Sequence, residues 1–311
     1  VVIIAISKLF TFLIMYYPKC VISSMATCFH EDGALDLAGL GMNVEFQKQA
    51  GIKTICVLGG TGEAASMTRE ERHAVMEETM RHADGLNVIF GALAGTPADV
   101  KADIEKAKEL GANASMVMAP PFVRPSERDV EHLVKDYASV KMPLIIFNTP
   151  SRSAFNMSAG LVKHLNEIEE VVGIKESSGD MTLLQNIRVD CPSPFGLLTG
   201  GDDLYLPTLA LGGDGGILAC AGVIPEVFVK MDQAIADGDL ETARRCHYAG
   251  KLLNDVMYKA SHPVPMKIAM ASRGLPAGIC RPPLSDLEAA HKAQVYTALK
   301  KIKEEVSDIA G

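Results

Sequence analysis

From residue 20 onward, short apolar runs rich in β-branched residues alternate with longer amphipathic stretches. Each short run is apolar throughout rather than at every second position, which is typical of strands buried on both faces of a parallel sheet. The runs predict eight strands, at Val21–Thr27, Thr54–Leu58, Asn87–Gly91, Ala114–Met118, Leu144–Asn148, Val171–Lys175, Gly196–Thr199 and Gly216–Cys220.

The amphipathic stretches carry the signals of helix starts and stops. Thr68 is followed three positions later by Glu71, which is the spacing of a capping box. Pro97 opens a stretch that stops at Gly111, and Ser126 precedes a first turn that contains acidic residues. Eight strand–helix units in about 200 residues favour a closed (β/α)8 barrel over an open sheet.

After the eighth predicted strand the chain has only helical patterns, at Pro225–Asp237, Asp239–Ala260, Pro265–Arg273 and Ser285–Val306. This is too much chain for the last barrel helix alone, so we expect a small helical bundle packed on the barrel. The predicted fold class is α/β, a (β/α)8 TIM barrel over residues 20–224 with a C-terminal helical extension over residues 225–311. No flexible linker separates the two parts, so we expect one compact unit.

Residues 1–19 form an apolar N-terminal extension, in which Lys8 is the only charge among the first seventeen residues. The run is shorter than the about 20 residues that a membrane span needs, and it lacks the basic start of a signal peptide. We interpret it as an upstream extension, with Met15 as a candidate true start. A packed helix or an oligomer contact is the second interpretation, and a membrane anchor is the third. We expect no membrane partner.

The composition narrows the range of partners. Thirty Lys and Arg against 38 Asp and Glu give a formal net charge of −8, and we find no basic cluster of the kind that binds nucleic acid. None of the seven cysteines forms a C-x-x-C pair, which predicts buried, reduced thiols in a cytoplasmic protein. The eight histidines are scattered, so we expect no metal site.

In a barrel of this kind the functional side chains lie at the carboxyl ends of the strands. The second predicted strand is followed by the turn Gly59–Glu63, whose glycines can present backbone N–H groups to an anion; a plain structural turn is the alternative. The fifth is followed by Arg152, whose guanidinium suits a carboxylate; a solvated surface arginine is the alternative.

The sixth predicted strand ends at Lys175, an unusual residue to close a buried apolar run. Burying an ammonium group is costly unless it pairs with an anion or its pKa falls. A lowered pKa makes the neutral amine available as a nucleophile toward a carbonyl group. The alternative is a lysine paired with a carboxylate such as that of Glu63 or Glu176.

Five segments along the chain resemble, in order and spacing, those of the dihydrodipicolinate synthase/N-acetylneuraminate lyase family. They are GGTGE, FNTPSR, GIKESSGD, GGDD and GGDGGILACAGVIPE. The opening SSMATCFHEDGALD and the C-terminal HPVPMKIAMASRGL also resemble family segments. The resemblance covers about residues 20–290, whereas residues 1–19 have no recognised counterpart.

The resemblance implies a class I lyase in which Lys175 forms a Schiff base with the keto carbon of pyruvate or another small 2-oxo acid. The protonated imine withdraws electrons and stabilises a carbanion at C3, which permits aldol, dehydration or deamination reactions. It also implies that the Thr61 hydroxyl and the N–H groups of the Gly60–Thr61 turn hold the carboxylate of the acid. The backbone around Ile217 belongs to the same pocket, and no cofactor or metal is implied.

The chain departs from the family pattern at three positions that carry hydroxyl groups in its proton relay. Gly60 stands where the family has Thr, Phe147 where it has Tyr, and Phe122 where it has a Tyr that reaches a neighbouring subunit. A Phe ring cannot donate or accept a proton, and losing a positioned acid or base typically costs about 10²–10⁴-fold in rate. Proton transfer must then use Ser177, Thr199, a bound water or the substrate itself.

Arg152 matches the family arginine that holds a carboxylate of the second substrate. We therefore expect a Schiff-base lyase of the aldolase, dehydratase or deaminase type. One alternative is a true 4-hydroxy-tetrahydrodipicolinate synthase, which condenses pyruvate with aspartate semialdehyde; another is a non-catalytic barrel that binds a 2-oxo acid. The resemblance also implies a homo-oligomer, commonly a dimer of dimers, with Phe122 at the tight dimer interface.

Overall fold

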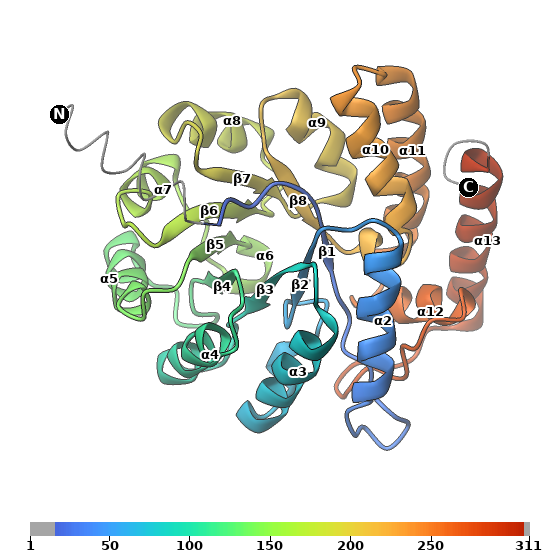
Figure 1. Ribbon diagram of the computed structural model, residues 1–311, viewed down its shortest axis with the longest axis horizontal. Helices are drawn as coiled ribbons and strands as arrows, with labels where there is room; N and C mark the ends of the chain where they lie inside the picture. The colour runs from blue at the N-terminus through green and yellow to red at the C-terminus, as the bar shows by residue number, and fades with distance from the viewer. Residues whose placement is uncertain (1–15, 308–311) are drawn as a thin grey trace.

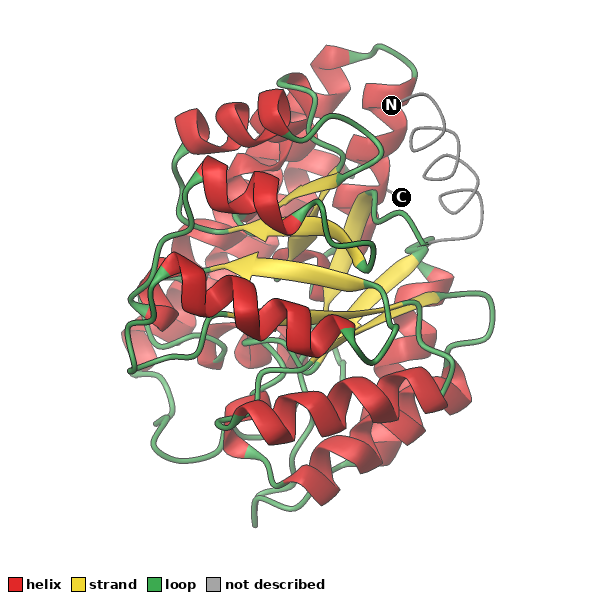
Figure 2. Ribbon diagram, turned by 90° about the vertical axis from the view of Figure 1, so that its left-hand side faces the viewer, coloured by secondary structure: helices red, strands yellow, loops and turns green. Residues whose placement is uncertain are grey.

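The computed structural model of the protein describes residues 16–307, in which eight parallel strands close into a barrel in the order β1 to β8. Helices surround the strands (Figure 1), and Figure 2 shows the strands enclosed by them. The arrangement confirms the predicted (β/α)8 barrel with a C-terminal helical extension. The strands are β1 Cys20–Ser24, β2 Thr54–Val57, β3 Asn87–Gly91, β4 Ala114–Met118, β5 Leu144–Asn148, β6 Val171–Glu176, β7 Gly196–Thr199 and β8 Gly215–Leu218.

The helices and short 3-10 turns fill the connections. The barrel region contains α2 Leu37–Gln49, α3 Arg69–His82, α4 Pro97–Glu109, α5 Glu127–Ala138, α6 Pro150–Ser153, α7 Ala159–Leu165, α8 Met181–Asp190 and α9 Tyr205–Ala210, with the 3-10 turns η1 Ala64–Ser66 and η2 Asp202–Leu204. After β8 come η3 Cys220–Gly222, α10 Pro225–Ala236, α11 Leu240–Met257, α12 Val264–Ser272 and α13 Ala289–Val306.

Local chemistry explains several helix boundaries. Thr68 and Glu71 form the predicted capping box: Glu71 N–H donates to Thr68 Oγ1 at 3.2 Å, and Thr68 N–H donates to the Glu71 carboxylate at 2.9 Å. Ser126 caps α5 in the same way with Asp129. Gly111, just beyond α4, has a φ of +79°, a left-handed conformation that ends a helix.

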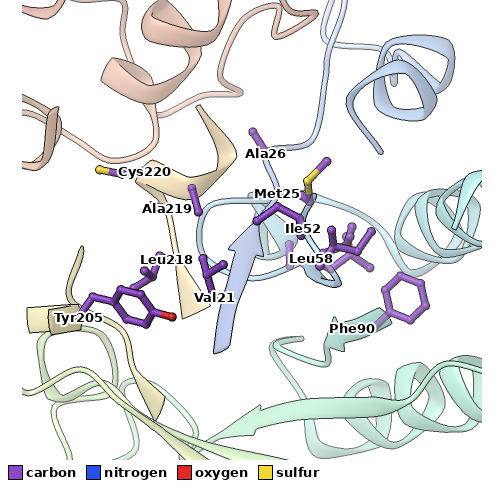
Figure 3. Packing of buried hydrophobic residues seen from close by; sticks show 14 of the residues in the cluster. Val21, Met25, Ala26, Ile52, Leu58, Phe90, Tyr205, Leu218, Ala219 and Cys220 are labelled. Carbon is purple, nitrogen blue, oxygen red and sulfur yellow. The ribbon is translucent and has the colours of Figure 1, made fainter. Parts of the chain in front are cut away.

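The core has two layers, because successive side chains of a strand point to opposite faces. The inner layer fills the barrel with residues from all eight strands: Ile22, Cys56, Ile89, Ala114, Met116, Ile145, Phe147, Val172, Leu198 and Ile217. The outer layer lies between strands and helices. Figure 3 shows part of it, where Val21 and Leu218 of the neighbouring strands β1 and β8 lie beside Tyr205 of α9.

Several element boundaries differ by one residue from the sequence-based prediction, and the larger differences are in β1, β8, α11 and α13. β1 ends at Ser24 rather than at Thr27, because the following turn leaves the sheet and Thr27 Oγ1 donates to the carbonyl of Gly62. β8 runs from Gly215 to Leu218, and Cys220 lies instead in η3, where its N–H donates to Asp202 Oδ1. α11 ends at Met257 rather than at Ala260, and α13 begins at Ala289 rather than at Ser285.

The N-terminal end of the described chain packs against the barrel, and its last helix, α13, packs against other helices of the C-terminal extension. Tyr16 contacts the inner core layer, and the Tyr17 hydroxyl donates to Asp214; the rest of the predicted extension, residues 1–15, lies outside the described residues. At the other end, α11 packs against both α10 and α13. No helix within residues 16–307 combines the length and apolar character needed to cross a membrane.

Candidate active site

A cavity of about 720 Å³ opens at the mouth of the barrel, where the strands end. Its lining includes all six residues predicted for substrate binding or catalysis, Gly60, Thr61, Phe147, Arg152, Lys175 and Ile217. These residues are far apart in sequence and meet because the carboxyl ends of parallel strands share one rim of the barrel. Phe122, the predicted interface residue, does not line this cavity; its side chain is 97% exposed on the loop between β4 and α5.

Lys175 lies in β6, beside Phe147 of β5, with which it is in register. Its side chain is buried, and Nζ lies 4.6 Å from the centroid of the Phe147 ring. The paired-lysine alternative does not hold: Glu63 pairs with Lys267, and the Glu176 carboxylate accepts hydrogen bonds from Asn148 and Ser178. Among the described residues, Lys175 forms no ion pair.

The surroundings of Lys175 favour its neutral form. Burial lowers the pKa of its amine, and the negative charge of Asp202 opposes that shift only in part. An aromatic ring attracts a cation weakly compared with a carboxylate, so the Phe147 ring does not replace a counter-ion. The amine is therefore placed as a nucleophile, with its lone pair available at the base of the cavity.

The turn after β2 holds Thr61 over the cavity. Thr61 is buried, and its Oγ1 lies 3.0 Å from Ser24 Oγ and 3.0 Å from His262 Nε2. The turn uses the N–H groups of Gly62 and Glu63 for its own hydrogen bonds. The N–H groups of Gly60 and Thr61 have no partner among residues 16–307, so they are available to an anion.

A buried ion pair fixes that turn from behind. Glu63 has a φ of +53°, and its carboxylate lies 2.7 Å from Nζ of Lys267 in α12. The other carboxylate oxygen accepts a hydrogen bond of 2.9 Å from the N–H of Arg281. The C-terminal extension thus holds the turn after β2 in place.

Gly60 leaves free space at the cavity. A Cβ atom added there would meet no atom within 4 Å, and the residue is exposed. A larger side chain would therefore fit at this position, so packing does not require a glycine there. It widens the entrance to the cavity beside Thr61.

Arg152 lies in the short helix α6 and is exposed, at the boundary between the main cavity and a second, mainly apolar cavity of about 370 Å³. Gly60, Phe147 and His262 line both cavities as well. Arg152 has no ion-pair partner within the described chain. Its guanidinium is therefore free to bind an anionic group of a ligand that extends from one cavity into the other.

Two hydroxyl groups were predicted as routes for proton transfer, and their hydrogen bonding differs in the structure. Ser177 lines the main cavity, and its Oγ is shielded from solvent without a hydrogen-bond partner among the described residues. The position of a Cβ on Gly200 would lie 1.8 Å from Ser177 Oγ and 2.7 Å from Lys175 Cε, so the hydroxyl lies close to the lysine side chain. Thr199 Oγ1 instead accepts a hydrogen bond from Gly201 N–H.

The sequence-based reasoning missed His262, which comes from the connection between α11 and α12. Its ring stacks on Tyr258 with centroids 5.4 Å apart and planes at 15°. Burial, together with the positive charges of Arg152 and Lys175, lowers the pKa of His262 to about 3. His262 is therefore a neutral imidazole at ordinary pH.

Behind His262 lies a carboxyl group that was also missed. The Tyr258 hydroxyl donates to Asp202 at 3.4 Å, and burial raises the pKa of Asp202 to about 6. Tyr258 and His262 lie outside the strand ends to which the prediction was confined, because they belong to the helical extension, whereas Asp202 follows β7 within the recognised segment GGDD. The recognised segment HPVPMKIAMASRGL contains His262, and that was the signal that could have found it.

Within residues 16–307, no group of three or more His, Cys, Asp or Glu side chains is arranged to hold a metal ion. All seven cysteines are free thiols.

Comparison with known proteins gives concordant results. The model of the dihydrodipicolinate synthetase family matches residues 17–302. A protein of Methanothrix thermoacetophila named 4-hydroxy-tetrahydrodipicolinate synthase is 33% identical over 291 residues, which are 93% of this chain and 98% of the relative. The dihydrodipicolinate synthase structure from Aquifex aeolicus has a TM-score of 0.88 at 30% identity, covering 94% of this chain and 99% of that one. YagE, a prophage protein of E. coli K12 solved in complex with pyruvate, has a TM-score of 0.87 at 27% identity, covering 92% and 98%.

Proposed function

This chain belongs to the dihydrodipicolinate synthetase family and is a lyase of that family, and from that premise we propose that Lys175 forms a Schiff base with the keto carbon of pyruvate or another small 2-oxo acid. The observation that carries the proposal is the buried amine of Lys175, which has no counter-ion among the described residues and a lowered pKa. The pyruvate complex of the related YagE supports the choice of ligand.

In this mechanism the neutral amine of Lys175 attacks the keto carbon, the keto oxygen leaves as water with the two amine protons, and one proton taken up from solvent gives the protonated imine. Loss of a C3 proton then gives an enamine, whose C3 can add to the carbonyl carbon of a second substrate; the reverse steps cleave that bond. The Ser177 hydroxyl, beside the lysine side chain, is the protein group we assign to hydrogen-bond the departing oxygen. Phe147 cannot exchange protons, so it serves as an apolar wall.

The carboxylate of the 2-oxo acid is assigned to the turn after β2. Its binding groups are the Thr61 hydroxyl and the N–H groups of Gly60 and Thr61, which the turn itself does not use. The backbone at Ile217 lines the same cavity. This arrangement favours an acid over a neutral ketone, because anions are stabilised by converging N–H and O–H donors.

Arg152 is assigned to an anionic group of the second substrate. One specific candidate reaction is the condensation of pyruvate with aspartate semialdehyde. It is favoured by Arg152 and by the name of the Methanothrix relative, 4-hydroxy-tetrahydrodipicolinate synthase. The residues Gly60, Phe147 and Phe122 argue for a different second substrate, because they remove three hydroxyl groups. Assaying the purified protein with pyruvate and aspartate semialdehyde, and then with hydroxylated 2-oxo acids for cleavage, decides between the two.

Reductive trapping tests the Schiff base itself. The protein is incubated with pyruvate, reduced with borohydride, weighed by mass spectrometry and digested to locate the adduct. We expect one adduct, on the peptide that contains Lys175, and none in the variant Lys175→Met. The matched control Lys259→Met removes an exposed lysine and should trap like the parent. Absence of an adduct with several 2-oxo acids would favour the non-catalytic binding barrel.

The assembly and the location of the protein are part of the same proposal. Phe122 and Val123 are 97% and 66% exposed, and such an apolar pair on one loop supports a contact with a second copy of the chain in a dimer or a dimer of dimers. The variant Phe122→Asp should shift the molecular mass in sedimentation toward the monomer. Seven free thiols support a reducing, cytoplasmic environment.

A further inference from the structure

Three side chains from separate parts of the chain form a hydrogen-bonded row at the edge of the main cavity. Ser24 Oγ donates to Thr61 Oγ1 at 3.0 Å, and Thr61 Oγ1 lies 3.0 Å from His262 Nε2. Ser24, Thr61 and His262 all line the cavity that contains Lys175. Thr61 therefore has a protein partner on two sides before any ligand binds.

The number of available protons restricts which hydrogen bonds Ser24, Thr61 and His262 can form together. A threonine hydroxyl has one proton to donate and two lone pairs that accept. Because Ser24 already donates to Thr61, the Thr61 proton can go either to His262 or to a ligand. A carboxylate has no proton to donate, so it can bind the Thr61 oxygen only by accepting that single proton. The imidazole must then be the donor in its contact with Thr61.

We propose that His262 is a positioning residue, whose Nε2–H donates to Thr61 Oγ1 and leaves the Thr61 proton directed at the carboxylate of the 2-oxo acid. The inference rests on the proposed function, since it takes the Thr61 hydroxyl as a carboxylate-binding group. It explains why a histidine from the C-terminal extension reaches into the mouth of the barrel.

The surroundings of His262 fix both its charge and its tautomer. Arg152 and, in its protonated form, Lys175 are the basic groups that act on the ring, Tyr258 stacks on it, and Tyr258 in turn contacts Asp202. Burial and the two positive charges hold the pKa of His262 near 3, so the ring carries one proton. His262 Nδ1 is shielded from solvent and has no partner among the described residues, whereas Nε2 has Thr61. The single proton is therefore best placed on Nε2.

The test compares an acid ligand with its neutral ester. For the parent, His262→Phe and His262→Asn, we measure the concentration of pyruvate, and of methyl pyruvate, that gives half-maximal borohydride trapping on Lys175. His262→Phe keeps a ring but removes the donor, so the pyruvate value should rise about tenfold, the effect of one hydrogen bond to a charged site. The methyl pyruvate value should change less than about twofold. His262→Asn keeps an N–H donor and should recover most of the loss.

A double-variant cycle links the effect to Thr61. Thr61→Val removes the hydroxyl that His262 is proposed to orient, so adding His262→Phe to Thr61→Val should cause no further loss of pyruvate affinity. Equal losses for acid and ester, or independent effects of the two changes, would overturn the proposal. A pH effect would also overturn it. If the pyruvate affinity of the parent increased as the pH falls from about 8 to about 5, and that of His262→Phe did not, the protonated imidazolium would be the form that binds.

The outcomes separate this inference from the proposed function. If the parent forms no adduct on Lys175, the Schiff-base mechanism is wrong; if the parent traps pyruvate and His262→Phe traps it equally well, only the role of His262 is wrong. Should the variants fail to fold, nitrogen-15 NMR of the parent with bound pyruvate decides. A protonated Nε2 and a bare Nδ1 on His262 agree with the proposal, and the opposite tautomer overturns it.

Discussion

Two lysines are buried within residues 16–307, in two regions that surround the same ammonium group in opposite ways. Lys267 of α12 is 2% exposed, lies 2.7 Å from the carboxylate of Glu63 and donates to the carbonyl of Ile279 at 2.5 Å. Lys175 of β6 is 9% exposed and has the Phe147 ring beside it, but no ion-pair partner among the described residues.

The difference shows how to read a buried charge. A buried ion pair with further hydrogen bonds satisfies both charges, and here it fixes a turn of the barrel to the C-terminal extension. A buried amine without an anion cannot hold its proton well, and it becomes a nucleophile. The same residue type therefore stabilises the architecture at position 267, and at position 175 it is the group that we propose for the chemistry.

The largest expected effect comes from removing the unpaired lysine. Lys175→Met should abolish pyruvate trapping and lyase turnover, because no other lysine of the described chain lines the cavity. The free energy of unfolding should stay the same or increase, since no counter-ion is left behind and an apolar group suits the site. Mass spectrometry of the trapped protein and urea unfolding measure both effects. More than a few per cent of residual turnover would show that Lys175 is not the nucleophile.

Substitution of the paired lysine, Lys267, should mainly lower stability, whereas substitution of Lys175 mainly removes activity. Lys267→Met leaves the Glu63 carboxylate buried without a counter-ion, so the free energy of unfolding should fall by about 3–5 kcal/mol. The double variant Lys267→Met with Glu63→Gln removes both charges and should recover part of the loss. Urea unfolding of the parent and the two variants checks this, and a loss below about 1 kcal/mol for the single variant would contradict the comparison.

The same contrast extends to two arginines. Arg281 is held by Glu71, whereas Arg152 has no such partner among the described residues. Arg152→Ala should therefore lower the turnover of an acidic second substrate about tenfold. This is the lower end of the range expected for losing a hydrogen bond to a charged group, because Arg152 is exposed. Steady-state kinetics should show no comparable loss in pyruvate trapping. Equal, small changes for acidic and neutral second substrates would make Arg152 a surface residue only.

The smallest expected effect is a pH dependence of the free energy of unfolding that comes from Lys175. The pKa of Lys175 in the folded protein lies below its ordinary value of 10.5, so the unfolded chain binds more protons between the two values. The contribution of Lys175 to stability is present above about pH 10.5 and is lost as the pH falls toward the folded pKa. The advantage of Lys175→Met over the parent should thus grow as the pH falls through this window, by at most about 1.4 kcal/mol per unit. A difference that is constant with pH would contradict the lowered pKa.

Much of this molecule was determined by its sequence. The eight apolar runs predict the eight strands, because burial on both faces of a parallel strand leaves a local pattern. The capping boxes at Thr68 and Ser126 are equally local, since both partners lie within one helical turn. The placement of Lys175 at the barrel mouth follows from its position at the end of a strand.

Only the tertiary structure decided how distant groups pair. The contact of Thr61 with His262 joins residues 201 positions apart, and the Glu63–Lys267 ion pair likewise joins the turn after β2 to α12. A sequence reveals that these side chains exist and that one lysine could pair with Glu63, but it does not reveal which one. That choice depends on closure of the barrel and on docking of the C-terminal helices, which together set the distances at which charges and protons are shared.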